Sequence, residues 1–395
     1  MKLTLTLATL ATAAATAKEF NGLSYNPKQL KTGACPTVDT VRDDLGVLSK
    51  YTNQVRIYSV KDCNQGEPVL RAMENTDWKV QLGMWVSEVE SVYEADRNEL
   101  IRLAGVFDFK KHVTAVIVGN EAIYRKEQTS AQIAAKVRDT KAALAKVGLG
   151  SIPVTASETW PHYDPTLIAA VDYVNVHAFP FWEGTPIAGA QDKVFEHIYD
   201  IQKLAGSKKV VVGETGWPDA GGNHEAAVPS LANEQRYLKE FICRANLEKI
   251  DYIWFSAFDE AWKPVTNASD VETHWGVLKG DKTPKFASPM YDCKGFVPNA
   301  KPSSSLSSSP SSSPSSSKTG SKTSTTPSGH SNSNKSDSKS SDTDNESDSD
   351  SDNSSDSQES SDTSKSGAVS LLVGSGFSAV GIAASVAALA VSALI

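Results

Sequence analysis

Short apolar runs, each long enough for one strand, recur at fairly even intervals over residues 18–300 of this 395-residue chain. Several are continuous Val/Ile runs, which are typical of parallel strands buried on both faces. Patterns with helical spacing lie between them, at 37–49, 130–147, 194–204 and 233–245. Thr129 or Ser130 is suited to cap the second of these helices, and Gly148 to end it. The runs cover 22–26, 54–59, 80–86, 113–120, 153–158, 173–178, 210–214 and 252–258.

Eight strand–helix units over 18–300 predict an α/β fold, a (β/α)8 TIM barrel, because the length is typical of such a barrel. An open doubly wound sheet is the alternative. It is disfavoured because no GxGxxG motif follows the first run.

Residues 301–366 have a composition that cannot build a folded core. They contain 31 serines in 66 positions and no aromatic residue, whereas 30 of the 31 aromatic residues precede residue 300. Ser, Thr and Pro dominate the first part, and ten acidic residues lie between Asp337 and Asp362. Such Ser/Thr/Pro tracts are often O-glycosylated, and acidic tracts stay solvated. We therefore expect 301–366 to be a disordered stalk, either glycosylated or plain.

Both ends of the chain resemble targeting segments. Residues 1–17 begin with a Lys near the N-terminus, continue as an apolar run and end in Ala-Thr-Ala. This pattern indicates a secretory signal peptide, with a short core helix as the alternative. Residues 367–395 carry no charge and are rich in small and apolar residues. They indicate a GPI-anchor signal with attachment at Ser366 or Gly367, and a retained transmembrane anchor is the alternative.

A secreted chain matures in an oxidising compartment, so its four cysteines suggest two disulfides. Of the three pairings, the nearest in sequence are Cys35–Cys63 and Cys243–Cys293, and we expect these. Secretion also makes the Asn-X-Ser triplets expected glycosylation sites. Their asparagines are Asn267 in the folded part and Asn334, Asn345 and Asn353 in the stalk.

Charge and histidine spacing disfavour two functional classes. The chain has 39 basic and 47 acidic residues, a net charge of −8, whereas nucleic-acid binders normally show a basic surface. The seven histidines show no HxH or HExxH spacing and the cysteines form no CxxC. We therefore expect no metal site, no cofactor and no nucleic-acid partner.

Polar and aromatic residues follow the predicted strands at their carboxyl ends, where TIM barrels place their chemistry. The run at 113–120 ends in Gly-Asn120 and is followed by Glu121, while the run at 210–214 ends in Gly-Glu214. Because neighbours on a strand point to opposite faces, we expect Glu260 to face inward and Asp259 outward. The other residues expected at this rim are Tyr25, Arg56, Tyr58, Glu158, His177, Phe179, Trp217 and Lys263, and at least two of Trp160, Trp182, Trp217 and Trp262 are expected to stack on sugar.

Carboxylates and aromatic rings gathered at one rim are typical of a sugar site. Glycoside hydrolysis needs two carboxyl groups, one to protonate the leaving oxygen and one to attack the anomeric carbon or activate water. We expect the fourth and seventh strands to face each other across the barrel. Their ends would bring Glu121 and Glu214 within the roughly 5–5.5 Å of a retaining enzyme. The alternative is that both are solvated acids or ion-pair partners.

Three rim residues have a structural interpretation beside the functional one. Arg56 either orients Glu214 by a charge-assisted bond or closes a surface ion pair. His177 either supports the site through hydrogen bonds or contacts the sugar. Glu158 is expected to be structural.

VIVGNEA at 116–122 and VVVGETGWP at 210–218 resemble the two signatures of glycoside hydrolase family 17, the β-1,3-glucanases. VRIYS at 55–59 and AFDEAWKP at 257–264 are also similar to that family, and the resemblance covers 20–295. It implies a retaining barrel enzyme in which Glu121 is the proton donor and base, and Glu214 the nucleophile. Asn120 would bind the sugar 2-hydroxyl, and Glu260 and Lys263 match a further acidic and basic pair. The stalk and the GPI signal resemble those of fungal cell-wall members.

The resemblance implies a retaining endo-β-1,3-glucanase acting on cell-wall β-glucan. The alternative is a β-1,3-glucanosyltransferase that uses the same two glutamates, and HAFPFW at 177–182 departs from many relatives in a way that leaves the two open. A non-catalytic wall-binding module would require loss of a carboxylate, and both are present. The expected partners are β-1,3-glucan and the membrane through the GPI lipid, with a covalent link to wall glucan as a further option. The expected locations are the cell membrane and the cell wall, and we expect a monomer.

Overall fold

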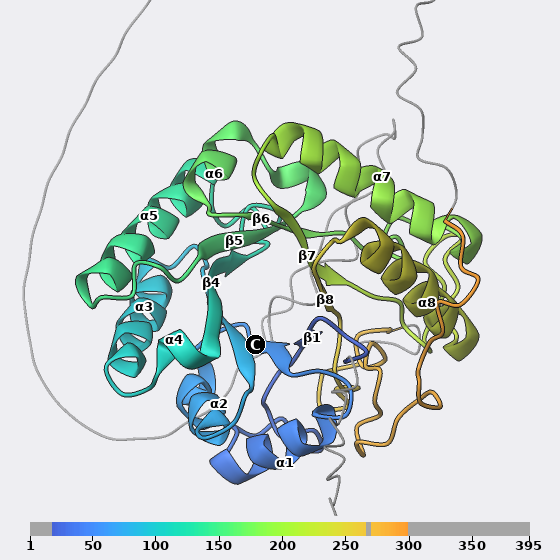
Figure 1. Cartoon of the computed structure of the whole chain (residues 1–395), viewed down its shortest axis with the longest axis horizontal. Helices are drawn as coiled ribbons and strands as arrows, with labels where there is room; N and C mark the ends of the chain where they lie inside the picture. The colour runs from blue at the N-terminus through green and yellow to red at the C-terminus, as the bar shows by residue number, and fades with distance from the viewer. Residues whose placement is uncertain (1–17, 266–269, 299–395) are drawn as a thin grey trace, which may run out of the picture. The chain divides into compact units, whose positions relative to one another are not determined.

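Eight parallel strands close into a barrel in the computed structural model, which describes residues 18–265 and 270–298 (Figure 1). Each strand pairs with the next in sequence, and Leu23 of the first pairs with Trp254 of the last. The predicted TIM barrel is therefore confirmed. The strands are β1 (Leu23–Ser24), β2 (Gln54–Arg56), β3 (Lys79–Met84), β4 (Val113–Asn120), β5 (Val154–Thr159), β6 (Val174–His177), β7 (Val210–Thr215) and β8 (Tyr252–Trp254).

Helices surround the ring of strands and cover its outer face (Figure 1). Their apolar sides pack on the Val/Ile-rich strands, which are buried on both faces as continuous apolar runs require. They are α1 (Val38–Leu48), α2 (Gly66–Met73), α3 (Glu90–Ala104), α4 (Phe109–His112), α5 (Ser130–Lys146), α6 (Pro165–Ala170), α7 (Ile187–Ala205) and α8 (Leu231–Glu248), with short 3-10 turns at Asp62–Asn64 and Trp160–His162.

Side-chain caps fix where several helices begin. Thr37 before α1 and Thr129 before α5 each form a capping box with the residue three positions later. Ser230 caps α8 through the backbone N–H of Asn233. Each cap satisfies a backbone donor that the helix itself leaves free.

Several predicted strands extend beyond the observed ones, and two of them do so by three residues or more at the carboxyl end. The runs at 54–59 and 252–258 were expected to be strands throughout, but β2 ends at Arg56 and β8 at Trp254. After β2, the backbone N–H groups of Val60 and Lys61 donate to the carboxylate of Asp96 at 2.8 and 2.9 Å. A side chain thus replaces the sheet as acceptor, and the chain turns into the rim loop.

Both expected disulfides are present, Cys35–Cys63 and Cys243–Cys293. The signal peptide, the stalk, the GPI signal and the asparagines at 267, 334, 345 and 353 lie outside the described residues. Over 18–265 and 270–298, none of the helices combines the length and the apolar character that crossing a membrane requires.

Candidate active site

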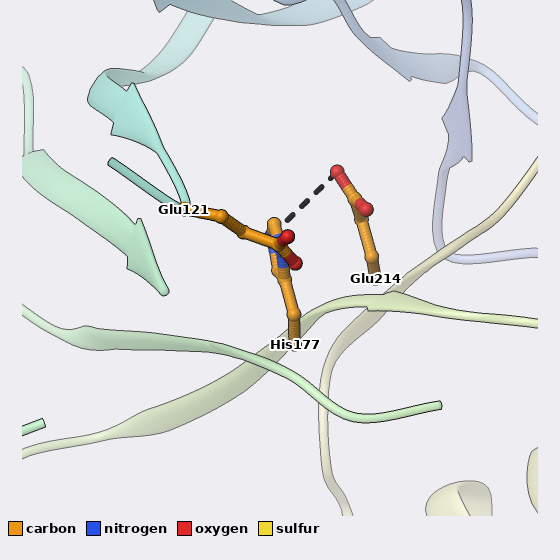
Figure 2. A group of neighbouring side chains, drawn as sticks. All are labelled: Glu121, His177 and Glu214. Carbon is orange, nitrogen blue, oxygen red and sulfur yellow. Dashed lines mark hydrogen bonds and ion pairs between the residues drawn. The ribbon is translucent and has the colours of Figure 1, made fainter. Parts of the chain in front are cut away.

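Glu121 follows β4 and Glu214 lies near the end of β7, and their carboxyl groups converge above the barrel (Figure 2). One carboxylate oxygen of each and one ring nitrogen of His177 all lie within 4.8 Å of one another. The expectation that the two strands face each other was wrong, because two strands separate them on one side of the ring and four on the other, so that β8 is the strand opposite β4. His177, the last residue of β6, lies between the two glutamates and contacts both.

The backbone of Glu121 adopts a left-handed conformation, with φ of 58°. Gly119, two residues earlier, also has a positive φ of 81°, and the N–H of Glu121 donates to the carbonyl of Ser157 on β5 at 2.8 Å. A non-glycine residue is uncommon in this region and stays there only when its surroundings hold it. The turn aims the Glu121 side chain across the rim instead of along the strand.

Burial raises the pKa of Glu121 to about 7, while the charges of Arg125, Arg56 and His162 act in the opposite direction. The side chain remains 21% exposed, so it is accessible from the rim. A carboxyl group in this environment holds a proton in mildly acidic solution and can donate it.

His177 is fully buried, and burial lowers its pKa to about 3, so the ring is neutral. Its Nε2 lies 2.9 Å from Nη1 of Arg56, which can only donate, so Nε2 accepts. Nδ1 therefore carries the proton and donates to Oε1 of Glu121 at 2.8 Å. This bond leaves the other oxygen of Glu121 free to carry a proton toward a substrate. The expectation that His177 contacts sugar is thus wrong, and its supporting role is confirmed.

Arg56 joins the residues on both sides of His177. Its Nη1 lies 3.0 Å from Oε1 of Glu214 and donates to the carbonyl of Gly213 at 3.0 Å. Its Nη2 donates to Oδ1 of Asn120 at 2.7 Å. With 1% of its surface exposed, Arg56 orients Glu214 from below and is not available to a sugar.

The contacts of Glu158 confirm its expected structural role. Its carboxylate accepts from the backbone N–H groups of Ile123 at 2.9 Å and Tyr124 at 3.3 Å. Burial raises its pKa to about 8. A side chain from β5 therefore holds the turn that follows Glu121.

Glu260 and Lys263 form an ion pair of 2.7 Å beside Glu214. Burial disfavours the Lys263 charge, but Glu260, Glu272 and Glu214 outweigh this and raise its pKa. Asp259 turns the other way and binds Lys285 at 2.9 Å. The expected orientation of this neighbouring pair is therefore confirmed.

Two of the expected aromatic contacts were wrong because the side chains are buried. The indole N–H of Trp217 donates to the carbonyl of Val228, and the ring has no exposed surface. The hydroxyl of Tyr25 donates to Asp44 at 2.7 Å inside the protein, with 1% of the residue exposed. The other aromatic residues predicted at the rim are half-buried, and their sugar contacts stay a prediction. They are Tyr58, Trp160, Phe179, Trp182 and Trp262.

Within 18–265 and 270–298, two groups of carboxylates and imidazoles are spaced closely enough to hold a cation. They are Glu121, His177 and Glu214, and the group formed by Asp219, Asp259 and His274. A cation of the protein already contacts each group. Arg56 lies against the first, and Nζ of Lys285 lies 2.9 Å from both aspartates of the second.

Two charged residues of the site, Arg125 and Glu272, were not predicted from the sequence. Burial raises the pKa of Glu272 to about 7, with Lys263 acting in the opposite direction and Glu260 and Glu121 adding to the rise. Neither residue lies on a predicted strand end: Arg125 is four positions beyond Glu121, and Glu272 lies in the segment after β8. The Asn-Glu turn after β4 was the signal that could have pointed to Arg125. No sequence pattern pointed to Glu272.

Residues 22–276 match the family model described as the BtgE/BtgC glycoside hydrolase domain. A glucan 1,3-beta-glucosidase of Saccharomyces cerevisiae is 31% identical over 309 residues, which cover 73% of this chain and 98% of the relative. A "Probable glucan endo-1,3-beta-glucosidase btgC" of Aspergillus fumigatus is 32% identical over 70% of this chain, which spans only 44% of that relative.

Among solved structures, an active-site mutant of a Rhizomucor miehei beta-1,3-glucanosyltransferase in complex with laminaritriose is similar to this chain. The identity is 31% and the TM-score 0.63, with 70% of this chain and 97% of the other covered. The match of the family model over most of the barrel agrees with the paired glutamates at its rim. The chain therefore belongs to the BtgE/BtgC glycoside hydrolase family and is a glycoside hydrolase.

Proposed function

We propose that this chain is a retaining endo-β-1,3-glucanase in which Glu121 is the acid/base and Glu214 the nucleophile. The observation that carries the proposal is the pair of glutamates, with one carboxylate oxygen of each within 4.8 Å. Retaining glycosidases hold their carboxyl groups roughly 5–5.5 Å apart, whereas inverting enzymes leave room for a water between them. The separation supports direct attack on the sugar.

The first step breaks the glycosidic bond. Glu121 gives its proton to the bridging oxygen while a carboxylate oxygen of Glu214 attacks the anomeric carbon from the opposite face. The leaving chain departs as an alcohol, and the remaining sugar is bound to Glu214 as an ester. The buried, protonated Glu121 and the Arg56-oriented Glu214 have the environments that these two roles require.

The second step releases the sugar. Glu121, now a carboxylate, accepts a proton from water as the water oxygen attacks the anomeric carbon, and the bond to Glu214 breaks. Two inversions restore the original configuration. The N–H of His177 donates to Glu121 and stabilises the charged form that exists between the two steps.

The names of the similar proteins support a β-1,3-glucan substrate, since glucan 1,3-beta-glucosidases and a glucanosyltransferase complex with laminaritriose are among them. Product profiles on linear β-1,3-, β-1,4- and mixed-linkage glucans test this proposal. We expect short oligosaccharides from the β-1,3-glucan alone. Release of glucose only, from chain ends, would contradict the endo mode, and equal cleavage of β-1,4-glucan would contradict the substrate.

Transfer to a second glucan chain is the other candidate, and the similarity to the Rhizomucor miehei glucanosyltransferase favours it. The chemistry differs only in the second step, where a sugar hydroxyl replaces water as the acceptor. A defined β-1,3-gluco-oligosaccharide distinguishes the two. Products longer than the starting oligomer, at low enzyme and high substrate concentration, would establish transfer.

We further propose that the enzyme is secreted and held at the cell surface by a GPI lipid, after which a link to wall glucan can form. The support is the uncharged segment 367–395 and the A-x-A end of residues 1–17. A phosphatidylinositol-specific phospholipase should release the protein from membranes. A mature protein that still contains the 367–395 peptide would contradict this.

A further inference from the structure

Arg125 lies in the turn directly after the acid/base residue and is almost fully buried, with 7% of its side chain exposed. Its guanidinium lies 4.5 Å from the ring centroid of Trp85, which follows β3. A buried guanidinium is costly unless each side of it is matched by acceptors or a counter-charge. The contacts of this side chain therefore indicate what it does.

Two of these contacts go to backbone carbonyls, one directly before Glu121 and one in the neighbouring loop after β3. Nη1 donates to the carbonyl of Asn120, the residue before Glu121. Nη2 donates to the carbonyl of Val86, in the loop after β3, at 2.7 Å. The backbone N–H of Arg125 also donates to the carbonyl of Glu121 at 2.8 Å. The guanidinium thus ties the residue before Glu121 to the loop after β3, and the backbone N–H of Arg125 holds the carbonyl of Glu121 itself.

The carboxylate of Glu127 supplies the counter-charge for the buried guanidinium of Arg125. Nε and Nη2 of Arg125 donate to the two oxygens of Glu127 at 2.9 and 2.5 Å, so the pair is bidentate. Such a fork holds its geometry better than a single charged contact. Glu127 therefore fixes the orientation in which Arg125 reaches Asn120 and Val86.

Among the positive charges that lower the pKa of Glu121 against the effect of burial, that of Arg125 has the largest effect. The other groups that face Glu121 come from β2, β5, β6, β7 and the neighbouring loops. Arg56 and His162 favour its charged form, His177 donates to it as a neutral ring, and Tyr124 is half-buried beside it. The remaining facing acids are Glu158, Glu214 and Glu272.

We propose that Arg125 is a positioning residue for the reaction: it holds Glu121 in its left-handed turn and, balanced by Glu127, sets the pH above which Glu121 no longer donates a proton. This inference rests on the proposed acid/base role of Glu121.

Three substitutions separate the two parts of the role. Arg125→Met removes the charge and the clamp, so we expect kcat to fall at least tenfold and the basic limb of the kcat/KM profile to move up by about one pH unit. Arg125→Lys keeps the charge but not the fork, so kcat should fall while the basic limb stays near that of the wild type. Glu127→Gln leaves the arginine charge uncompensated and should move the basic limb to lower pH.

Matched controls come from an exposed pair of the same kind on α8. Arg236 and Glu240 lie 2.8 Å apart, and Arg236 is 46% exposed. Arg236→Met and Glu240→Gln change the net charge in the same way and should leave the profile unchanged. Trapping with an activated 2-fluoro glycoside counts the competent enzyme, so loss of folded protein is not read as loss of kcat.

The opposite shifts for Arg125→Met and Glu127→Gln are the result that supports the proposal. Basic limbs that coincide with the wild type in both variants would overturn it, and would leave Arg125 a purely structural residue. If Arg125→Met does not fold, the downward shift of Glu127→Gln and the unshifted limb of Arg125→Lys decide the question. Titration of Glu121 by infrared difference against Glu121→Gln gives the same answer without substrate, so a wild type inactive on glucan would contradict the proposed function alone.

Discussion

Glu121 and Glu214 are the same residue type a few ångströms apart, and their surroundings make them chemically different. Glu121 sits in a left-handed turn, with its pKa raised by burial and its oxygen held by a neutral histidine. Glu214 is buried against the guanidinium of Arg56 at 3.0 Å. A glycosidase needs two carboxyl groups with different roles, one to give a proton and one to attack the anomeric carbon.

The pH dependence of activity follows from this difference. Because the pKa of Glu121 is raised to about 7, activity should fall as the pH rises through about 7, where the acid loses its proton. A kcat/KM profile on a β-1,3-glucan measures the position of that limb. Glu121→Gln is assayed with an activated aryl glycoside, whose leaving group needs no proton. The rate of the first step should then no longer fall as the pH rises through about 7. A limb that persists unchanged would assign it to another group.

The contacts of His177 with Arg56 and Glu121 keep its ring in a single tautomer. His177→Ala removes the donor to Glu121 and the acceptor of Arg56, so we expect kcat to fall by roughly 10²-fold, as for loss of other positioning groups. His177→Gln keeps a donor and an acceptor in similar places and should recover part of the loss. Equal activity of Ala and Gln variants would contradict the tautomer argument.

At the scale of elements, a buried lysine joins the ends of β7 and β8 to helix α8. Nζ of Lys285 lies 2.9 Å from Asp219 and from Asp259, which follow the two strands, and 3.4 Å from Glu234 on α8. Burial opposes the charge, but these acids outweigh it and raise the pKa of Lys285. Asp259 precedes Glu260, so the network fixes the backbone beside the active site.

Lys285→Met should destabilise the fold because it leaves buried acids without their counter-charge. We expect a loss of about 3–5 kcal/mol in the free energy of unfolding, measured by urea denaturation. The exposed pair of Lys203 and Asp200 on α7 supplies the control, since Lys203→Met should cost less than about 1 kcal/mol. Similar losses in both variants would show that the network contributes nothing special.

The strands and the helices α1, α5, α7 and α8 could be predicted from the sequence, whereas the other helices and several side-chain orientations were not. All eight strands were found from their apolar runs, because barrel strands are buried on both faces and carry a strong local signal. Glu121 and Glu214 were found because they directly follow or end such runs. Trp217 also sits near a strand end, yet it packs inward, since side-chain direction after the last ladder bond depends on distant neighbours. The Arg125 clamp depends on Val86, which no local pattern links to it.

For the whole molecule, buried carboxyl groups make stability depend on pH. The pKa values of Asp96, Glu272 and Glu158 are raised by burial to about 6, about 7 and about 8. The unfolded chain ionises such groups near pH 4, so their contribution is complete below that pH and is lost as the pH rises to 8. His177, with its pKa lowered to about 3, acts with the opposite sign below about pH 6.5. We expect the protein to be most stable in mildly acidic solution.

Glu158→Gln tests this linkage because the amide cannot ionise. Its oxygen can still accept from Ile123, while its NH2 group takes the place of the oxygen that accepts from Tyr124 and adds a loss that does not depend on pH. The loss of unfolding free energy between pH 5 and 7.5 should be smaller in the variant than in the wild type, by on the order of 2 kcal/mol. Urea denaturation at the two pH values measures it. An identical pH dependence in both proteins would mean that Glu158 ionises normally in the folded state.

The stereochemistry of azide rescue tests the roles of the two glutamates most directly. In Glu121→Ala, the first step with an activated aryl substrate still forms the ester on Glu214, and azide then attacks it without base help, so two inversions give the β-glycosyl azide. In Glu214→Ala, azide attacks the substrate directly, and one inversion gives the α-glycosyl azide. Nuclear magnetic resonance of the two products identifies each anomer. The β-azide from Glu121→Ala and the α-azide from Glu214→Ala are the result that the account predicts; the reverse pattern, or wild-type glucanase activity in both variants, would contradict it.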